Sequence, residues 1–113
     1  VERHRGTGAV RNAFVSGFGY RGRVAVASTV AHDCHQMLVV GTDRESMARA
    51  ANRVARMDGG VAVFIEGEEA AAVALPIAGL MSEGDPAEVA RDAQGVVAAM
   101  ERAGCRLNNA VMQ

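Results

Sequence analysis

Residues 42–75 read TDRESMARAANRVARMDGGVAVFIEGEEAAAVAL, and this stretch predicts a helix followed by a β-hairpin. Thr42 and Glu45 have the spacing of a capping box, in which a threonine hydroxyl and a glutamate side chain bind free amides of the first helical turn. Gly59-Gly60 supplies a stop, so we expect the helix over about residues 43–58. Five apolar residues fall on one face of it: Met47, Ala50, Ala51, Val54 and Met57.

The second half of the stretch predicts the hairpin. Val61-Ala62-Val63-Phe64-Ile65 is a short apolar run rich in β-forming residues, which is typical of a strand. Glu66-Gly67-Glu68 turns the chain, and residues 70–75 return as a second strand. Pro76 ends that strand, because proline has no amide to donate to a sheet.

Three further strands are expected before the helix. Residues 9–16 predict a short strand, and a glycine-rich turn follows at residues 17–22. Residues 23–30 are rich in β-branched side chains and predict the next strand. Residues 37–40 are apolar and end at Gly41, which is the pattern of a buried strand.

A second helix is predicted from Asp85, which can cap it, and Pro86, which suits its first turn. Gly104 ends this helix, and its apolar face comprises Val89, Ala93, Val96, Val97 and Met100. Each predicted helix has one apolar stripe, so we expect both to pack on the same face of the sheet. The sequence therefore predicts a single α+β domain: a two-layer sandwich with a mixed or mostly antiparallel sheet of about five strands and two amphipathic helices on one face.

Composition excludes several functional classes. The 113 residues carry 12 basic and 13 acidic side chains, and a net charge of −1 gives no electrostatic reason to expect nucleic acid or an anionic membrane as a partner. No apolar run approaches the ~20 residues of a membrane span. Two cysteines, Cys34 and Cys105, are too few for a disulfide framework, which favours the cytoplasm. Aromatic residues are only 4%, so the core is thin and a partner surface would stabilise it.

Gly17, Gly19 and Gly22 have the spacing of the dinucleotide-binding fingerprint, and Asp43 follows about 20 residues later. That chemistry requires a helix N-terminus directly after the glycines, where the pyrophosphate binds. The residues that follow are β-branched instead, so we interpret the glycines as a turn between strands.

His32-Asp33-Cys34-His35 is the densest cluster of chemically active side chains. Its two imidazoles can share a face in a turn, whereas on a strand they would point to opposite faces. One interpretation is a metal site completed by His4 and Cys105, although no ligand spacing supports it. A second is a polar loop whose side chains bind nearby backbone. A polar cluster that interrupts an apolar sheet favours a third, a contribution to a neighbouring active site.

Five strings of residues lie in order along the chain: Arg3-His4-x-Gly6-Thr7-Gly8, Gly17-Phe18-Gly19, Ala27-Ser28-Thr29-Val30-Ala31-His32-Asp33-Cys34-His35, Val39-Val40-Gly41-Thr42-Asp43 and Leu75-Pro76-Ile77-Ala78-Gly79-Leu80-Met81-Ser82. Shorter ones are Met47-Ala48, Asn52-Arg53 and Gly59-Gly60. Together they resemble the C-terminal domain of the bacterial adenine deaminase family. The resemblance runs from Glu2 to about Cys105, and the combination of the third and fifth strings is specific.

This resemblance implies a hydrolase of the metal-dependent amidohydrolase superfamily, which converts adenine to hypoxanthine and ammonia in purine salvage and adenine breakdown. In that family, manganese or iron in a (β/α)-barrel activates a water, and the hydroxide attacks the ring carbon that bears the amino group. This chain has no His-x-His pair and is too short for a barrel of ~250 residues. The resemblance thus implies that residues 1–113 are one C-terminal domain without the catalytic barrel, inactive alone and holding no metal itself.

The resemblance also implies partners and site residues. The partners are the barrel domain, adenine as the parent's substrate and further copies in a homo-oligomer. His32, Asp33 and His35 become candidates for lining the adenine pocket or orienting a metal ligand, with Arg3 and His4 as secondary candidates for substrate binding. One alternative is a non-catalytic module for support or oligomerisation, which the thin core favours. Another is a free-standing domain that binds a small molecule or metal.

Two positions depart from the family pattern. Cys34 and Gln36 stand where serine and asparagine are expected, and a thiol is a weaker hydrogen-bond donor than a hydroxyl. The resemblance also implies a final apolar strand that would begin at about Gln113, so we expect an open sheet edge that favours pairing with another chain. Because the chain begins with Val1 rather than methionine, we expect a domain of a longer protein.

Overall fold

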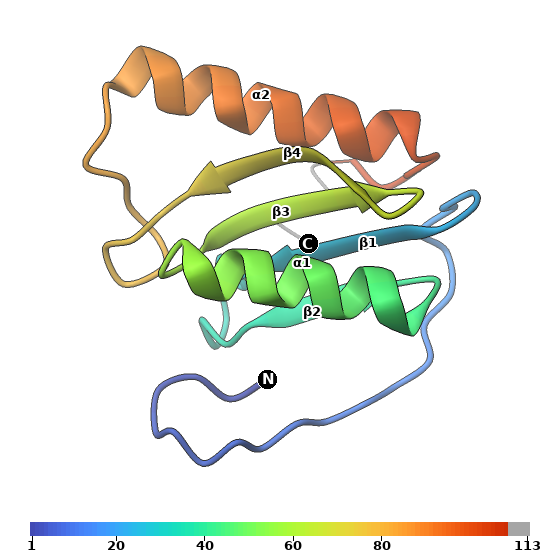
Figure 1. Ribbon diagram of the computed structural model, residues 1–113, viewed down its shortest axis with the longest axis horizontal. Helices are drawn as coiled ribbons and strands as arrows, with labels where there is room; N and C mark the ends of the chain where they lie inside the picture. The colour runs from blue at the N-terminus through green and yellow to red at the C-terminus, as the bar shows by residue number, and fades with distance from the viewer. Residues whose placement is uncertain (109–113) are drawn as a thin grey trace.

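A computed structural model describes residues 1–108 of the protein. It contains one antiparallel sheet of four strands, in the order β2-β1-β3-β4, and two helices (Figure 1). The elements are β1 Val24–Ser28, β2 Leu38–Gly41, α1 Arg44–Arg56, β3 Gly60–Ile65, β4 Glu68–Ala74 and α2 Pro86–Arg102. The α+β class and the antiparallel sheet are confirmed.

The sheet has four strands rather than about five, because residues 9–16 form no regular structure and instead run as an exposed extended arm. The glycines of residues 17–22 lead into β1 with no helix after them, as the turn interpretation requires. The strand β2 lies at the edge of the sheet and is only partly buried, whereas its apolar run predicted a buried strand. An apolar run indicates that the faces of a strand pack against other residues. It does not reveal whether a neighbouring strand pairs with each of its two edges.

Helix α1 begins one residue later than the capping-box spacing predicts. The side chain of Asp43, not Thr42, accepts the hydrogen bond from the Ser46 amide at 2.9 Å. That amide is also the main reason why the pKa of Asp43 lies below its ordinary value. The hydroxyl of Thr42 accepts from the Val24 amide at 2.9 Å, so it joins the start of the helix to β1.

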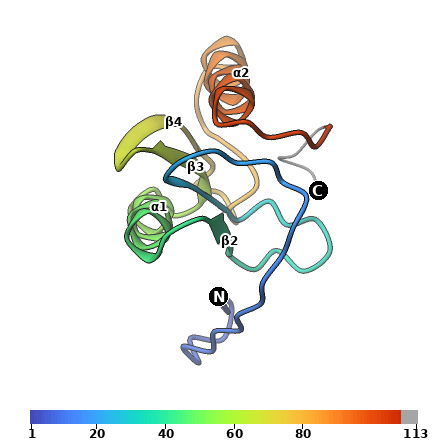
Figure 2. The same ribbon diagram turned by 90° about the vertical axis from the view of Figure 1, so that its right-hand side faces the viewer.

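The two helices lie on opposite faces of the sheet, so the prediction of a two-layer sandwich with both helices on one face is wrong (Figure 2). Val61 and Val63 of β3 pack with α2, whereas Ala62 and Phe64, the alternate residues of the same strand, pack with α1. Successive side chains of a strand point to opposite faces, so β3 supplies two separate cores. An apolar stripe shows that a helix is packed, but it does not specify the face on which it packs.

The two cores differ in the size of their side chains. The α1 core contains four alanines that are fully buried, at positions 25, 27, 50 and 62. The α2 core is built mainly from valines, with Met100 as its largest helical residue. Small side chains bury little area each, so neither face alone provides a large apolar core.

Gly60 starts β3 where only a glycine fits. Its φ is +131°, and a Cβ at this position would lie 2.0 Å from the carbonyl oxygen of Val73 on β4. The obstacle is backbone of the neighbouring strand, which cannot move without breaking the β3–β4 ladder. The Gly59-Gly60 pair therefore both ends the α1 region and sets the close approach of β4.

We predict that Gly60→Ala lowers the free energy of unfolding of the chain by about 3 kcal/mol or more, because it combines backbone strain with a backbone clash. Gly95→Ala in α2 is the matched control, since its nearest new neighbour is the Cβ of Ala71 at 4.0 Å. That substitution should stabilise the chain by about 0.5–1 kcal/mol through helix propensity. Urea unfolding followed by circular dichroism measures both, and equal effects of the two alanines would contradict the packing assigned to Gly60.

Candidate functional site

Four segments distant in sequence meet at the end of the sheet where β1 ends and β3 begins. The centre of this junction is Thr29, which directly follows β1 and is 1% exposed. Its hydroxyl accepts a hydrogen bond from the Gly60 amide at 2.8 Å and donates to the Gly79 carbonyl at 2.7 Å. One buried hydroxyl thus joins β1, β3 and the loop that follows β4.

Arg3 ties the N-terminal segment to the same junction. Its Nε donates to the carbonyl of His35 at 2.7 Å, and its Nη2 donates to the carbonyl of Ala78. The Arg3 amide donates to the side-chain oxygen of Gln36 at 2.9 Å. A Cβ at Gly79 would lie 2.5 Å from Arg3 Nη2, so glycine lets the guanidinium reach this loop. Arg3 therefore holds the backbone of two loops together.

The predicted cluster at residues 32–35 forms a turn. The amides of Cys34 and His35 both donate to the carbonyl of Ala31, at 3.2 and 2.7 Å. The side chains of His32 and Asp33 project into solvent, 62% and 91% exposed, with His32 Nε2 3.4 Å from Asp33 Oδ1. The turn closes at His35, whose φ of +51° reverses the chain into the segment before β2.

His35 differs from the other members of the turn. Its side chain is partly buried, and its Nδ1 is shielded from solvent without a hydrogen-bond partner among residues 1–108. A shielded imidazole nitrogen can donate or accept a hydrogen bond once a partner group is supplied. The structure thus presents two exposed polar side chains and one shielded imidazole nitrogen along four residues.

The structure brings some sequence-predicted residues together and separates others. Arg3, His35 and Gln36 are joined at the junction, whereas His4 is exposed and its amide donates to Glu2 Oε1 at 2.5 Å. Two of the three guanidinium nitrogens of Arg3 already donate to backbone carbonyls. Within residues 1–108, no group of three or more His, Cys, Asp or Glu side chains is placed to hold a metal ion.

Glu2 organises the loop that precedes the arm. Its carboxylate accepts hydrogen bonds from the amides of Arg5 at 2.6 Å and Thr7 at 3.1 Å, and from the Thr7 hydroxyl at 2.9 Å. These donors, the Arg5 amide first, lower the pKa of Glu2 to about 2. Residue spacing does not reveal this role of Glu2, because the amides that donate to its carboxylate converge only in the folded loop.

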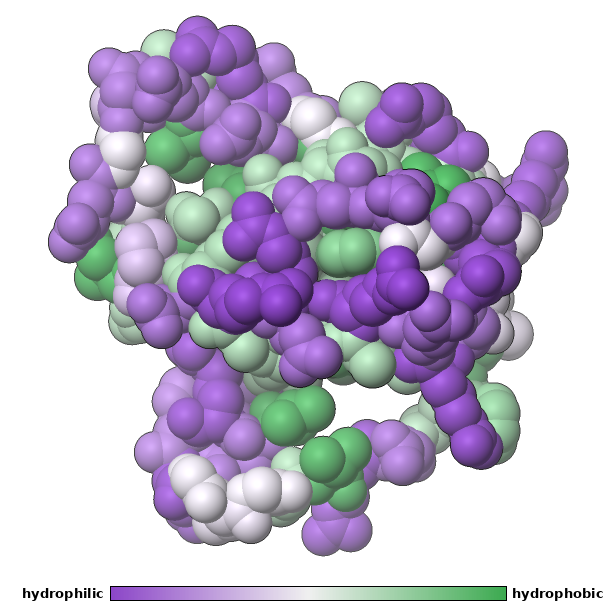
Figure 3. All heavy atoms as spheres, viewed as in Figure 1, coloured by the Kyte–Doolittle hydropathy of each residue, from purple (hydrophilic) through white to green (hydrophobic). Residues whose placement is uncertain are grey.

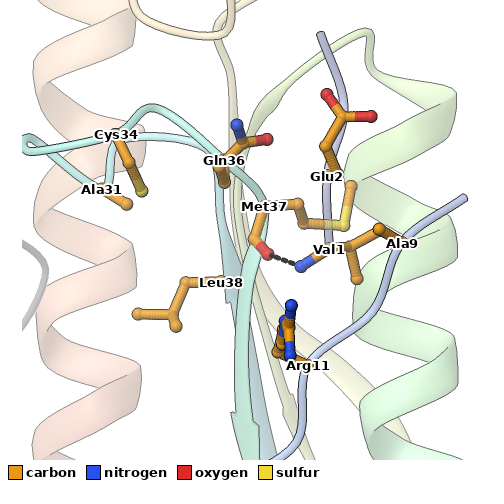
Figure 4. Close-up of a pocket in the computed structure, with 9 residues that line it drawn as sticks. All are labelled: Val1, Glu2, Ala9, Arg11, Ala31, Cys34, Gln36, Met37 and Leu38. Carbon is orange, nitrogen blue, oxygen red and sulfur yellow. Dashed lines mark hydrogen bonds between the residues drawn. The ribbon is translucent and has the colours of Figure 1, made fainter. Parts of the chain in front are cut away.

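A pocket of about 420 Å³ lies beside the turn, between the N-terminal segment and the start of β2 (Figure 4). Its walls are mostly apolar and come from Val1, Glu2, Ala9, Arg11, Ala31, Cys34, Gln36, Met37 and Leu38. The N-terminal nitrogen of Val1 donates to the Met37 carbonyl at 2.7 Å along one side of it. The pocket is thus framed by backbone of an edge strand rather than by convergent polar side chains.

Comparison with known proteins identifies the class of domain. A family model described as "Adenine deaminase C-terminal domain" matches residues 1–113. The chain is 71% identical over 113 residues to "Adenine deaminase" of Paracoccus denitrificans and 66% identical to that of Ruegeria pomeroyi, in each case covering 100% of this chain and 19% of the relative. It is 49% identical to "Adenine deaminase" of Rubrobacter xylanophilus, covering 99% of this chain and 18% of the relative.

The chain spans about a fifth of the length of the curated relatives it matches, so this α+β domain corresponds to one part of those longer proteins. It belongs to the adenine deaminase C-terminal domain family. The strings that carry the resemblance supply Arg3, Thr29, His35, Gly60 and Gly79, which all meet at the junction. Among the helices described, none has the length and apolar character needed to cross a membrane.

Removing the Thr29 hydroxyl should show how much this junction stabilises the domain. Thr29→Val keeps the shape but leaves the Gly79 carbonyl and the Gly60 amide without this partner in a buried site, which should cost about 1–3 kcal/mol. Thr29→Ser retains both hydrogen bonds and loses one methyl group, so it should cost about 1 kcal/mol or less. Thermal and urea unfolding of both variants measure the difference, and a valine variant as stable as the serine variant would contradict this assignment.

The hydrogen bonds of the Glu2 carboxylate should be lost only at very low pH. Because the folded pKa is lowered to about 2 from the ordinary 4.5, the carboxylate stabilises the loop fully above about pH 4.5 and loses this effect as pH falls toward 2. Amide proton shifts of Arg5 and Thr7, followed by NMR, should titrate with a midpoint near 2. They should be flat in Glu2→Gln, and a wild-type midpoint near 4.5 would show that the carboxylate is not held by these amides.

Proposed function

We propose that this chain is the C-terminal domain of a manganese- or iron-dependent hydrolase that converts adenine to hypoxanthine and ammonia. The observation that supports it is the match over residues 1–113 to a family whose relatives are named adenine deaminases. The parent protein would act in purine salvage and adenine breakdown in the cytoplasm, and it would assemble as a homo-oligomer. The 113-residue chain alone would be inactive.

In this proposal, the metal lies outside the chain, in a barrel domain on which this domain packs. The metal would supply a water of lowered pKa as the nucleophile for the amino-bearing ring carbon. We propose no metal-binding role for residues 1–108 themselves. Their contribution would be to hold, orient or enclose the purine and the barrel residues around it.

The turn at residues 32–35 is the part of the domain suited to that contribution. The side chains of His32 and Asp33 project into solvent, while Arg3 Nε donates a hydrogen bond to the carbonyl of His35. A projecting polar turn on a fixed base can place hydrogen-bonding groups with little loss of entropy on binding. We propose that the imidazoles of His32 and His35 and the carboxylate of Asp33 line the adenine pocket of the parent enzyme or position a barrel side chain. Arg3 and His4 stay candidates for contacts with the substrate.

A structural role for the domain is the second candidate. Three apolar side chains of the arm, Val10, Phe14 and Val15, are exposed, and Phe14 is fully so. Exposed apolar residues on one segment favour burial against another surface, such as the barrel or a second copy of the chain. In that case the domain would stabilise the assembly without affecting turnover directly.

The two candidates differ in what variants of the turn change in the full-length enzyme. We expect His32→Ala and Asp33→Asn to lower kcat by about 10- to 100-fold with little change in the melting temperature, because both side chains are exposed in the domain. His35→Asn, which tolerates a positive φ, should behave likewise.

Asp92→Asn, an exposed change in α2, is the matched control and should keep wild-type kinetics. Adenine deamination assays and thermal unfolding of the same preparations give both readouts. Wild-type kcat in all three turn variants, with altered melting or assembly, would contradict a role in the active site and favour the structural module.

A further inference from the structure

The first residue of the chain already pairs with the open edge of the sheet. The nitrogen of Val1 donates to the Met37 carbonyl at 2.7 Å, and the Met37 amide donates to the Val1 carbonyl at 3.1 Å. Two residues that exchange both hydrogen bonds form the hydrogen-bonded pair of an antiparallel ladder. Met37 directly precedes β2, so this pair lies in line with the free edge of that strand.

The free edge continues this ladder in one direction only. The Thr42 amide donates to the Val24 carbonyl of β1. By alternation, the backbone N–H and C=O groups of the even-numbered residues of β2 therefore point toward β1. Alternation then turns the backbone groups of Val39 and Gly41 outward, where the described chain provides no further strand. In the other direction the ladder ends opposite Arg3, because His35 has a positive φ and its carbonyl binds the guanidinium instead.

A slot lies along this edge. Residues 9–16 run past β2 without pairing to it, and Figure 3 shows an opening between the lower segment and the body of the molecule. The pocket of about 420 Å³ occupies the end of the slot nearest Val1, with Ala9 and Arg11 on one wall and Leu38 on the other. Leu38 is 50% exposed, which leaves an apolar side chain of an edge strand without a neighbour across the ladder.

We propose that the residues directly upstream of Val1 in the longer protein form an additional strand, which fills this slot and pairs antiparallel with β2. The Val1–Met37 pair fixes the register: the residue immediately before Val1 lies opposite Leu38, and the residue three before Val1 lies opposite Val40. The occupant is a segment of the same chain, since the matched family is a C-terminal domain and the chain covers 19% of its relatives. In the longer protein, the nitrogen of Val1 is a peptide amide that donates the same hydrogen bond to Met37.

The added strand explains three features together. It supplies partners for the outward backbone groups of Val39 and Gly41, and it places a side chain beside Leu38. It also lies between β2 and the arm, from which the Ala9 carbonyl already accepts a hydrogen bond from the Glu2 amide at 2.9 Å. In this proposal the pocket is filled by a segment of the protein's own chain rather than by a small molecule.

Disulfide trapping in the full-length protein tests both the pairing and its register. Cys34→Ser first removes the thiol in the pocket wall. One variant then carries cysteines at the residue before Val1 and at Leu38, a non-hydrogen-bonded pair whose Cα atoms should lie about 4.5 Å apart. The control carries cysteines at the residue before Val1 and at Val40, a diagonal pair about 7–8 Å apart, which is too long for a disulfide.

We expect the Leu38 variant to form an intramolecular disulfide with diamide about tenfold faster than the Val40 control, as measured by peptide mapping. Equal rates, or no crosslink in either variant, would overturn the proposal. A crosslink between two chains through position 38 would also overturn it, because a second copy would then occupy the edge. The readout does not depend on adenine turnover, so its failure is distinguishable from failure of the deaminase assignment.

A second measurement needs no cysteine. Hydrogen exchange of the segment that contains Val39 and Gly41 should be at least about tenfold slower in the full-length protein than in the chain that begins at Val1. Fast exchange in both forms would overturn the pairing even if the cysteine variants failed to fold.

Discussion

The central strand β3 has no solvent face, and the rest of the architecture depends on this constraint. Val61 and Val63 fill the space under α2 while Ala62 and Phe64 fill the space under α1, so both sides of the strand must be apolar. Such a strand is stable only if each face is covered, which requires one helix on each side of the sheet. Antiparallel pairing with β1 and β4 covers both of its edges as well. The open surfaces of the domain therefore lie at the two edge strands, β2 and β4, on the arm and on the loops at the ends of the strands.

The elements that the sequence predicted are those specified by local chemistry. The helix over about residues 43–58, the strand at 61–65, the hairpin and the helix after Asp85 all appear, because periodicity, caps and glycine stops act within a few residues. What local patterns do not specify is the partner of each face. The stripes of α1 and α2 are equally consistent with one face or two, and alternation along β3 decides between them only once its neighbours are known. Residues 9–16 have strand-forming side chains, yet in residues 1–108 no strand pairs with them.

The candidate site likewise has one part that the sequence reveals and one part that it does not. The turn at residues 32–35 was identifiable because a polar cluster interrupts an apolar sequence. The junction behind it was not identifiable from spacing, because Thr29 and Gly79 lie 50 residues apart and Arg3 and Ala78 lie 75 apart. Their acceptors are backbone carbonyls, which carry no side-chain signal in a sequence. Substrate binding by Arg3 stays a prediction, whereas the structure shows that its guanidinium binds the backbone carbonyls of His35 and Ala78.

The turn and the open edge are parts of one continuous segment, and this connects the two proposals. His35 lies two residues before Met37, and the ladder that begins at Val1 and Met37 ends where Arg3 binds the His35 carbonyl. If a strand from the preceding part of the protein pairs with β2, its last hydrogen-bonded pair, Val1 with Met37, would therefore lie next to the turn at residues 32–35. A ladder of hydrogen bonds constrains orientation far more than a flexible linker, whose ends sample many separations. The position of His32 and Asp33 relative to the rest of the enzyme would then be set by sheet register, and an error of one residue in that register would turn every side chain of the entering strand to the other face.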